Sequence, residues 1–158
     1  MENAVDEIRS EEVLRLASEA GRILLQNGAE ISRVEDTMER IASHYGVQGE
    51  NFFVLSNGIF TPGRSYANAQ FIPIKGASLD KVAAVNQFSR DIQAYDLSLE
   101  EAGARLEEIK NLPSKPLWEQ YVAAGIGCAA FCIIFGGGLA DAAASLAAAL
   151  FLNFFVAR

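Results

Sequence analysis

Residues 30–45 read EISRVEDTMERIASHY, and this stretch carries the clearest helical pattern of the chain. Its apolar side chains recur at alternating intervals of three and four residues, at Ile31, Val34, Met38, Ile41 and Tyr45. Residues at this spacing share one face of an α-helix, and a single apolar face is typical of a helix that packs on a core. Gly46 follows directly and predicts the end of the helix.

Further helices are expected on both sides of this stretch. Apolar residues at helical spacing predict a helix over 11–26, two more over 79–95 and 98–110, and a linker over 111–116. Ser78 predicts an N-cap for the helix over 79–95. Ser98, followed three residues later by Glu101, predicts a capping box for the helix over 98–110.

Short β-prone runs separate the two pairs of helices. They predict three antiparallel strands, at about 52–55, 59–61 and 66–74. The pair Asn57-Gly58 suits a type I′ hairpin, Pro62-Gly63 predicts a second turn, and Pro73 indicates an edge or an end of a strand. The first part of the chain is therefore expected to be an α+β domain of helices with a small antiparallel sheet.

Charge divides the chain into two unequal parts. Its 158 residues are within the size of one domain, and the net charge is −7. Residues 1–118 hold 12 basic and 18 acidic side chains, whereas residues 119–158 hold only Glu119, Asp141 and Arg158. An acidic chain without a basic cluster is a poor binder of nucleic acid. Its two cysteines also exclude a disulfide-rich scaffold.

The apolar part predicts a transmembrane helical hairpin. Residues 120–140 form a run of 21 residues without charge, and a spanning helix needs about 20 apolar residues. A shorter run follows Asp141, and Gly136-Gly137-Gly138 predicts a turn between the two. We expect spans at 118–135 and 139–157, and hence a domain over 1–116 followed by a two-span hairpin over 117–158 in the lipid bilayer.

Basic residues flank this predicted hairpin on one side only. Lys110 and Lys115 precede it and Arg158 follows it, so the positive-inside rule places both ends in the cytoplasm. The expected location is the cytoplasmic (inner) membrane, as a multi-pass protein with a cytoplasmic N-terminus. Two short spans make a weak membrane unit. They therefore predict that the chain works with a further membrane subunit or as a homo-oligomer. They also predict that the chain is a fragment of a longer transporter or a split subunit.

Side chains that support catalysis or metal binding are sparse. His44 is the only histidine, and Cys128 and Cys132 lie in the apolar run without nearby carboxylates. Metal sites need clustered ligands, and covalent catalysis needs a nucleophile beside a base. We therefore expect no metal, no cofactor, no catalytic residue and no enzymatic activity.

Five polar residues are candidates for binding a solute: Glu30, Arg33, Glu35, Asn57 and Asp141. Arg33 suits a carboxylate, and Glu30 with Arg33 would belong to a site for a small zwitterion or anion. The alternative is a solvated helix face, on which Glu30, Arg33, Asp36 and Arg40 form ion pairs at helical spacing. The alternative role for Asn57 is in the turn, and Asp141 either caps a helix or lies on a transport path.

Several blocks of the chain resemble the threonine/serine exporter family. The most specific is Leu25–Glu30 followed by Ser32–Ile41, and weaker blocks follow in the expected order at 53–62, 85–90, 97–102 and 135–141. The resemblance implies a secondary exporter of small metabolites, with a cytoplasmic N-terminal domain before several membrane helices. The solute it implies is threonine or serine.

Other functions are compatible with the same residues. Related two-component members of the family imply export of dicarboxylates of the succinate type, together with a partner membrane subunit. A membrane-anchored hydrolase that uses Glu30, Glu35 and a water molecule is a second alternative, and a regulatory module that docks on a transporter is a third.

Overall fold

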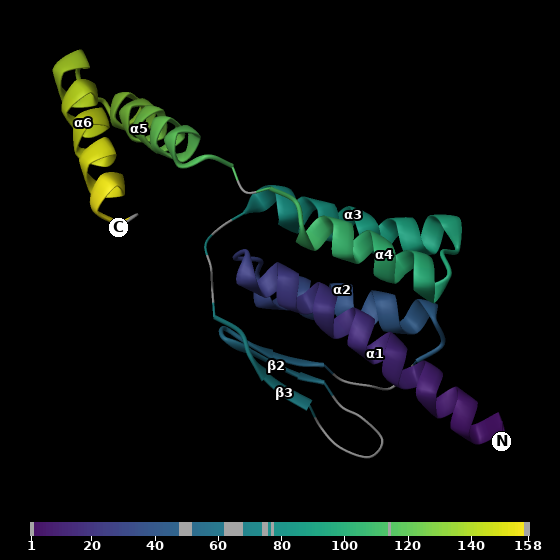
Figure 1. Ribbon diagram of the computed structural model, residues 1–158. Coiled ribbons are helices and arrows are strands. Elements are labelled where there is room, and N and C mark those ends of the chain that lie inside the picture. Colours follow the sequence, from purple (N-terminus) through teal and green to yellow (C-terminus); the bar gives the residue numbers. More distant parts are fainter. Residues whose placement is uncertain are drawn as a thin grey trace. The chain divides into compact units, whose positions relative to one another are not determined.

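The computed structural model describes residues 2–47, 52–61, 68–73, 76, 78–113 and 115–156. It divides the chain into two units, Met1–Leu112 and Pro113–Arg158. The described elements of the first unit are α1 (Glu2–Gln26), α2 (Ile31–His44), β1 (Phe53–Leu55), β2 (Gly58–Thr61), β3 (Asn68–Phe71), α3 (Leu79–Tyr95) and α4 (Leu99–Lys110). Those of the second unit are α5 (Leu117–Ile134) and α6 (Leu139–Val156) (Figure 1).

The first unit is built in layers around α1 and α2. These two helices pack against each other, contact the sheet on one side and contact α3 and α4 on the other (Figure 1). The apolar stripe predicted on α2 lies in this core, because Val34, Met38 and Ile41 are fully buried. Its two ends, Ile31 and Tyr45, remain partly exposed.

Helix ends agree with the predicted signals at three positions and differ at one. Gly46 follows α2 with φ of +84°, and the capping box of α4 is formed by Ser98 and Glu101. Ser78 is the N-cap residue of α3, as predicted, although its side chain makes no capping hydrogen bond. Helix α1 begins at Glu2 rather than at residue 11.

The sheet is antiparallel in the order β1-β2-β3. Leu55 pairs with Gly58, so Ser56 and Asn57 form the loop. Neither Asn57 nor Gly58 has a positive φ, and the predicted type I′ turn is therefore wrong. Glycine suits position 58 for another reason: a Cβ there would lie 3.2 Å from the carbonyl oxygen of Gln70 on β3. The turn predicted at Pro62-Gly63 lies outside the described residues.

The second unit consists of two helices of 18 residues each, separated at Gly136, which has φ of +91°. Among the described residues, no helix is both long enough and apolar enough to cross a membrane. The first turns contain Glu119 in α5 and Asp141 in α6.

The predicted fold class is corrected by these observations. An α+β domain followed by a transmembrane hairpin is not what the structure contains. The described chain is mostly helical, with one small three-stranded sheet. Helices α5 and α6 and the break at Gly136 lie close to the predicted positions, but no helix among the described residues is long and apolar enough to cross a membrane.

Candidate functional site

Charged and polar side chains of α2 and α3 line a common hollow of about 520 Å³, named here the α2–α3 hollow. Its lining residues are Glu30, Ser32, Arg33, Asp36, Thr37, Arg40, Ala83, Asn86 and Arg90. On each helix they follow the three- and four-residue spacing of one face. The hollow therefore forms where one face of α2 and one face of α3 meet, because the two helices pack against each other.

A hydrogen bond between uncharged groups joins the two helices in this hollow. The hydroxyl group of Thr37 donates to Oδ1 of Asn86, with 3.4 Å between the oxygens. Thr37 is only 2% exposed, whereas Asn86 is half-buried. The buried side chain of Thr37 therefore positions the amide of Asn86.

Charged side chains of both signs surround this pair. The hollow has three arginines and two carboxylates, which leaves one positive charge in excess. Within the described residues, no ion pair joins Glu30, Arg33, Asp36 and Arg40 to one another, so the pairs expected along α2 are absent. Of the third arginine, Arg90, one amino group donates to Gln87 at 2.8 Å.

The structure brings two of the five predicted site residues together. Glu30 and Arg33 line the hollow. The Glu35 carboxylate instead accepts a hydrogen bond from the backbone of Val54. Asn57 lies in the β1–β2 loop, where its carbonyl oxygen accepts from the N–H of Ile72 at 2.8 Å. Neither of these two lines the hollow.

Asp141, the fifth predicted residue, belongs to the second unit. Its Oδ2 accepts a hydrogen bond from the backbone N–H of Gly138 at 2.9 Å, directly before α6 begins. An acidic side chain here satisfies one of the free N–H groups of the helix N-terminus. This contact supports the capping interpretation of Asp141.

The predicted site residues do not include Thr37, Asn86 and Arg90, which also line the hollow. A signal for them was present in the sequence, because Thr37 lies in the specific block at 32–41 and the other two lie in the block at 85–90. Only the packing of α2 against α3 shows that the two blocks meet.

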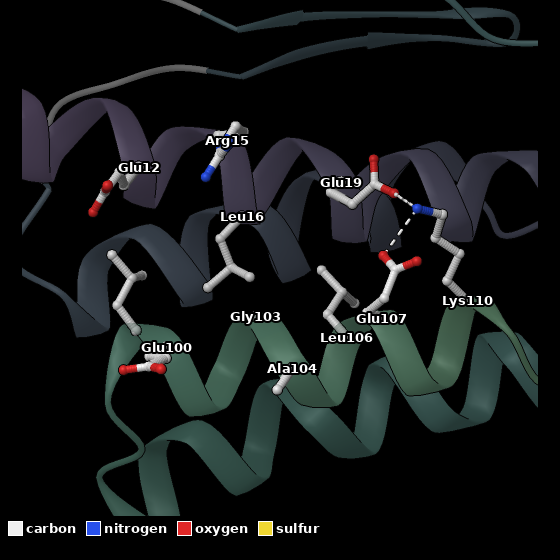
Figure 2. A pocket seen from close by; sticks show the side chains of 11 residues that line it. Glu12, Arg15, Leu16, Glu19, Glu100, Gly103, Ala104, Leu106, Glu107 and Lys110 are labelled. Atoms are coloured by element: carbon white, nitrogen blue, oxygen red, sulfur yellow. Dashed lines mark hydrogen bonds and ion pairs between the residues drawn. The ribbon is translucent and has the colours of Figure 1, made fainter.

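A second hollow, of about 720 Å³, lies between α1 and α4 and is shown in Figure 2. Three of its charged groups form ion pairs: Lys110 contacts Glu19 at 3.5 Å and Glu107 at 2.9 Å. The hydrogen bond from Arg22 holds the pKa of Glu19 below its usual value, and Glu107 raises the pKa of Lys110. The pair of Lys110 with Glu19 joins α4 to α1, so we assign this hollow a structural role.

Comparison with known proteins adds the family. A family model described as "Putative threonine/serine exporter" matches residues 15–158, nearly the whole chain and both helices of the α2–α3 hollow. The chain belongs to the threonine/serine exporter family. The resemblance seen in the sequence blocks is thereby confirmed. No curated protein and no solved structure matches the chain.

Family membership connects the chain to transport of a small-molecule solute of the threonine/serine type. It also connects the chain to a membrane, because exporters move their solutes across one. It favours a transport component over an enzyme.

Proposed function

We propose that the chain is a component of an exporter that moves threonine- and serine-type amino acids out of the cell, and that its α2–α3 hollow binds the solute. The observation that carries this proposal is the gathering of three arginines and two carboxylates on one side of two adjacent helices. The first unit would face the cytoplasm, where an exporter collects its solute. A further membrane subunit or further copies of the chain would complete the path.

An amino acid offers groups that match those of the hollow. Its carboxylate suits Arg33, because a guanidinium group binds a carboxylate through two parallel hydrogen bonds. Its ammonium group suits the carboxylates of Glu30 and Asp36, which have no ion-pair partner within the described residues. Because the hollow has one more positive than negative side chain, we expect it to bind the carboxylate of the amino acid more tightly than the ammonium group.

Dicarboxylate export is the second candidate function, and the same excess of arginine supports it. Two carboxylates could be shared among Arg33, Arg40 and Arg90, but Glu30 and Asp36 would then repel the ligand. A dicarboxylate is therefore expected to bind more weakly than an amino acid at neutral pH. Comparing the two ligands separates the candidates.

Calorimetric titration of the full chain with L-threonine, L-serine and succinate tests the proposal. We expect Arg33→Ala to weaken threonine binding about tenfold, the loss of one well-formed charged contact. Arg15→Ala is the matched control, because Arg15 is exposed and lines the α1–α4 hollow instead. Absence of threonine and serine binding, or an equal loss in the control, would overturn the proposal. Tighter binding of succinate would favour the dicarboxylate candidate.

The role in export is tested in cells. Deletion of the gene is expected to slow threonine and serine efflux and to raise their internal concentrations. Reintroduction of the unaltered chain should restore efflux, and the Arg33→Ala chain should restore it only in part. Unchanged efflux after deletion would contradict a role in exporting these solutes.

A further inference from the structure

Thr37 and Asn86 are uncharged residues of the α2–α3 hollow, and a hydrogen bond joins their side chains. Charged groups alone are sufficient to bind the carboxylate and the ammonium of an amino acid. A buried hydroxyl group aimed at a half-buried amide adds a different kind of recognition. It also costs free energy unless the hydrogen bond is made, so its presence calls for a role.

The amide of Asn86 keeps unused hydrogen-bonding capacity. An asparagine side chain has two N–H donors and an oxygen that accepts two hydrogen bonds. Thr37 uses one acceptor position of Oδ1, and within the described residues Nδ2 of Asn86 has no partner. With Oδ1 of Asn86 facing the Thr37 hydroxyl group, Nδ2 is left available.

We propose that Asn86 recognises the hydroxyl group of the bound amino acid, and that Thr37 is a positioning residue which orients the Asn86 amide. This inference rests on the proposed function of the α2–α3 hollow. A hydroxyl group both donates and accepts, so it pairs with Nδ2 and with the remaining acceptor position of Oδ1. An isosteric ligand without the hydroxyl leaves these groups unpaired and binds more weakly.

L-Threonine and L-valine are the probes, because they differ by a hydroxyl in place of a methyl group. Calorimetric titration of the full chain should give a preference for threonine of roughly 3- to 10-fold, the value of one net hydrogen bond. Asn86→Leu should remove this preference. Thr37→Val should reduce it, and Thr37→Ser, which keeps the hydroxyl, should retain it.

Thr61→Val is the matched control, because Thr61 makes a comparable buried hydrogen bond at 2.6 Å with Ser18, and neither residue lines the α2–α3 hollow. It should lower stability without changing the preference. The readout is the ratio of the two affinities, which a general loss of folded protein would not alter. Thermal unfolding of each variant confirms that it is folded at the temperature of the titration.

The outcomes separate this inference from the proposed function. If the unaltered chain binds threonine and valine equally, or if Asn86→Leu keeps the preference, the inference is overturned. The proposed function still stands in that case, provided that Arg33→Ala weakens both ligands. If the unaltered chain binds neither ligand, the proposed function fails and the inference fails with it.

Discussion

The carboxylate of Glu35 accepts a hydrogen bond from the backbone N–H of Val54, with 3.1 Å between Oε1 and the nitrogen. Val54 lies in β1, an edge strand of the sheet, so this bond joins α2 to the sheet. The opposite side of α2 carries the residues that line the α2–α3 hollow. Helix α2 therefore contacts the sheet through Glu35 and presents other side chains to the candidate site.

Replacement of Glu35 is therefore expected to affect stability rather than binding. Glu35→Ala should lower the free energy of unfolding by about 1–3 kcal/mol, because the N–H of Val54 loses its partner. Glu35→Gln should cost less, since its amide oxygen still accepts. Urea unfolding provides the measurement, and Glu39→Ala, at an exposed position of α2, is the control. A tenfold loss of threonine affinity in Glu35→Ala would instead place Glu35 in the binding site.

Acid is expected to weaken the contact between α1 and α4. The hydrogen bond from Arg22, with the nearby charge of Lys110, holds the pKa of Glu19 below its usual value despite partial burial. A carboxyl group with a lowered pKa in the folded state stabilises the protein above its unfolded pKa of about 4.3. That contribution is lost as the pH falls through the lower, folded value.

The measurement is the free energy of unfolding between about pH 6 and pH 3. Glu19→Gln should be less stable than the unaltered chain at pH 6, and the difference should shrink toward pH 3. Parallel curves for Glu19→Gln and the unaltered chain would show that Glu19 contributes no pH dependence.

Two helical glycines should respond in opposite ways to alanine. A Cβ at Gly21 would lie 2.3 Å from Sδ of Met38 and 3.1 Å from Cδ1 of Ile59, and both neighbours are buried. Gly21→Ala should therefore destabilise the protein by about 1–3 kcal/mol through overpacking. At Gly103, nothing lies within 4 Å of the added atom, so Gly103→Ala should stabilise α4 by about 0.5–1 kcal/mol.

Thermal unfolding of the two variants compares these effects directly. The same chemical change is made in both cases, and both positions lie inside helices. A higher melting temperature for Gly21→Ala would contradict the close packing of α1 on α2 and the sheet, and a lower one for Gly103→Ala would contradict the open space beside α4.

The start of α6 depends on Asp141. Gly138, which precedes the helix, has no side chain to cap it, and the Asp141 carboxylate accepts its N–H instead. Asp141→Ala should expose that N–H and accelerate its hydrogen exchange several-fold, whereas Asp141→Asn should have a smaller effect. Unchanged exchange at Gly138 would show that the contact adds no protection.

Local signals predicted the parts of the fold that depend on neighbours in sequence. The stripe from Val34 to Ile41 identified the core face of α2, and Ser98 with Glu101 identified the start of α4. The predicted hairpin between the first two strands is present, but the type I′ turn at Asn57-Gly58 was wrong because the pairing of Leu55 with Gly58 moves the loop back by one residue. Strand register depends on contacts across the sheet, and a short turn signal does not determine it.

The apolar tail shows the same limit. The sequence predicted the two helices and the break at Gly136 close to where they lie, but it also predicted that they span a membrane, and no helix among the described residues is long and apolar enough to do so.

The sequence by itself determined the helices of the first unit, the charged face of α2 and the exporter family, because these follow from periodicity and from ordered blocks of residues. Only the tertiary structure decided which polar groups form a site. Thr37 and Asn86 lie 49 positions apart and meet only because α2 packs against α3. Glu35, two residues before Thr37, turns to Val54 instead, since successive helical residues point in different directions and each contacts a different neighbour.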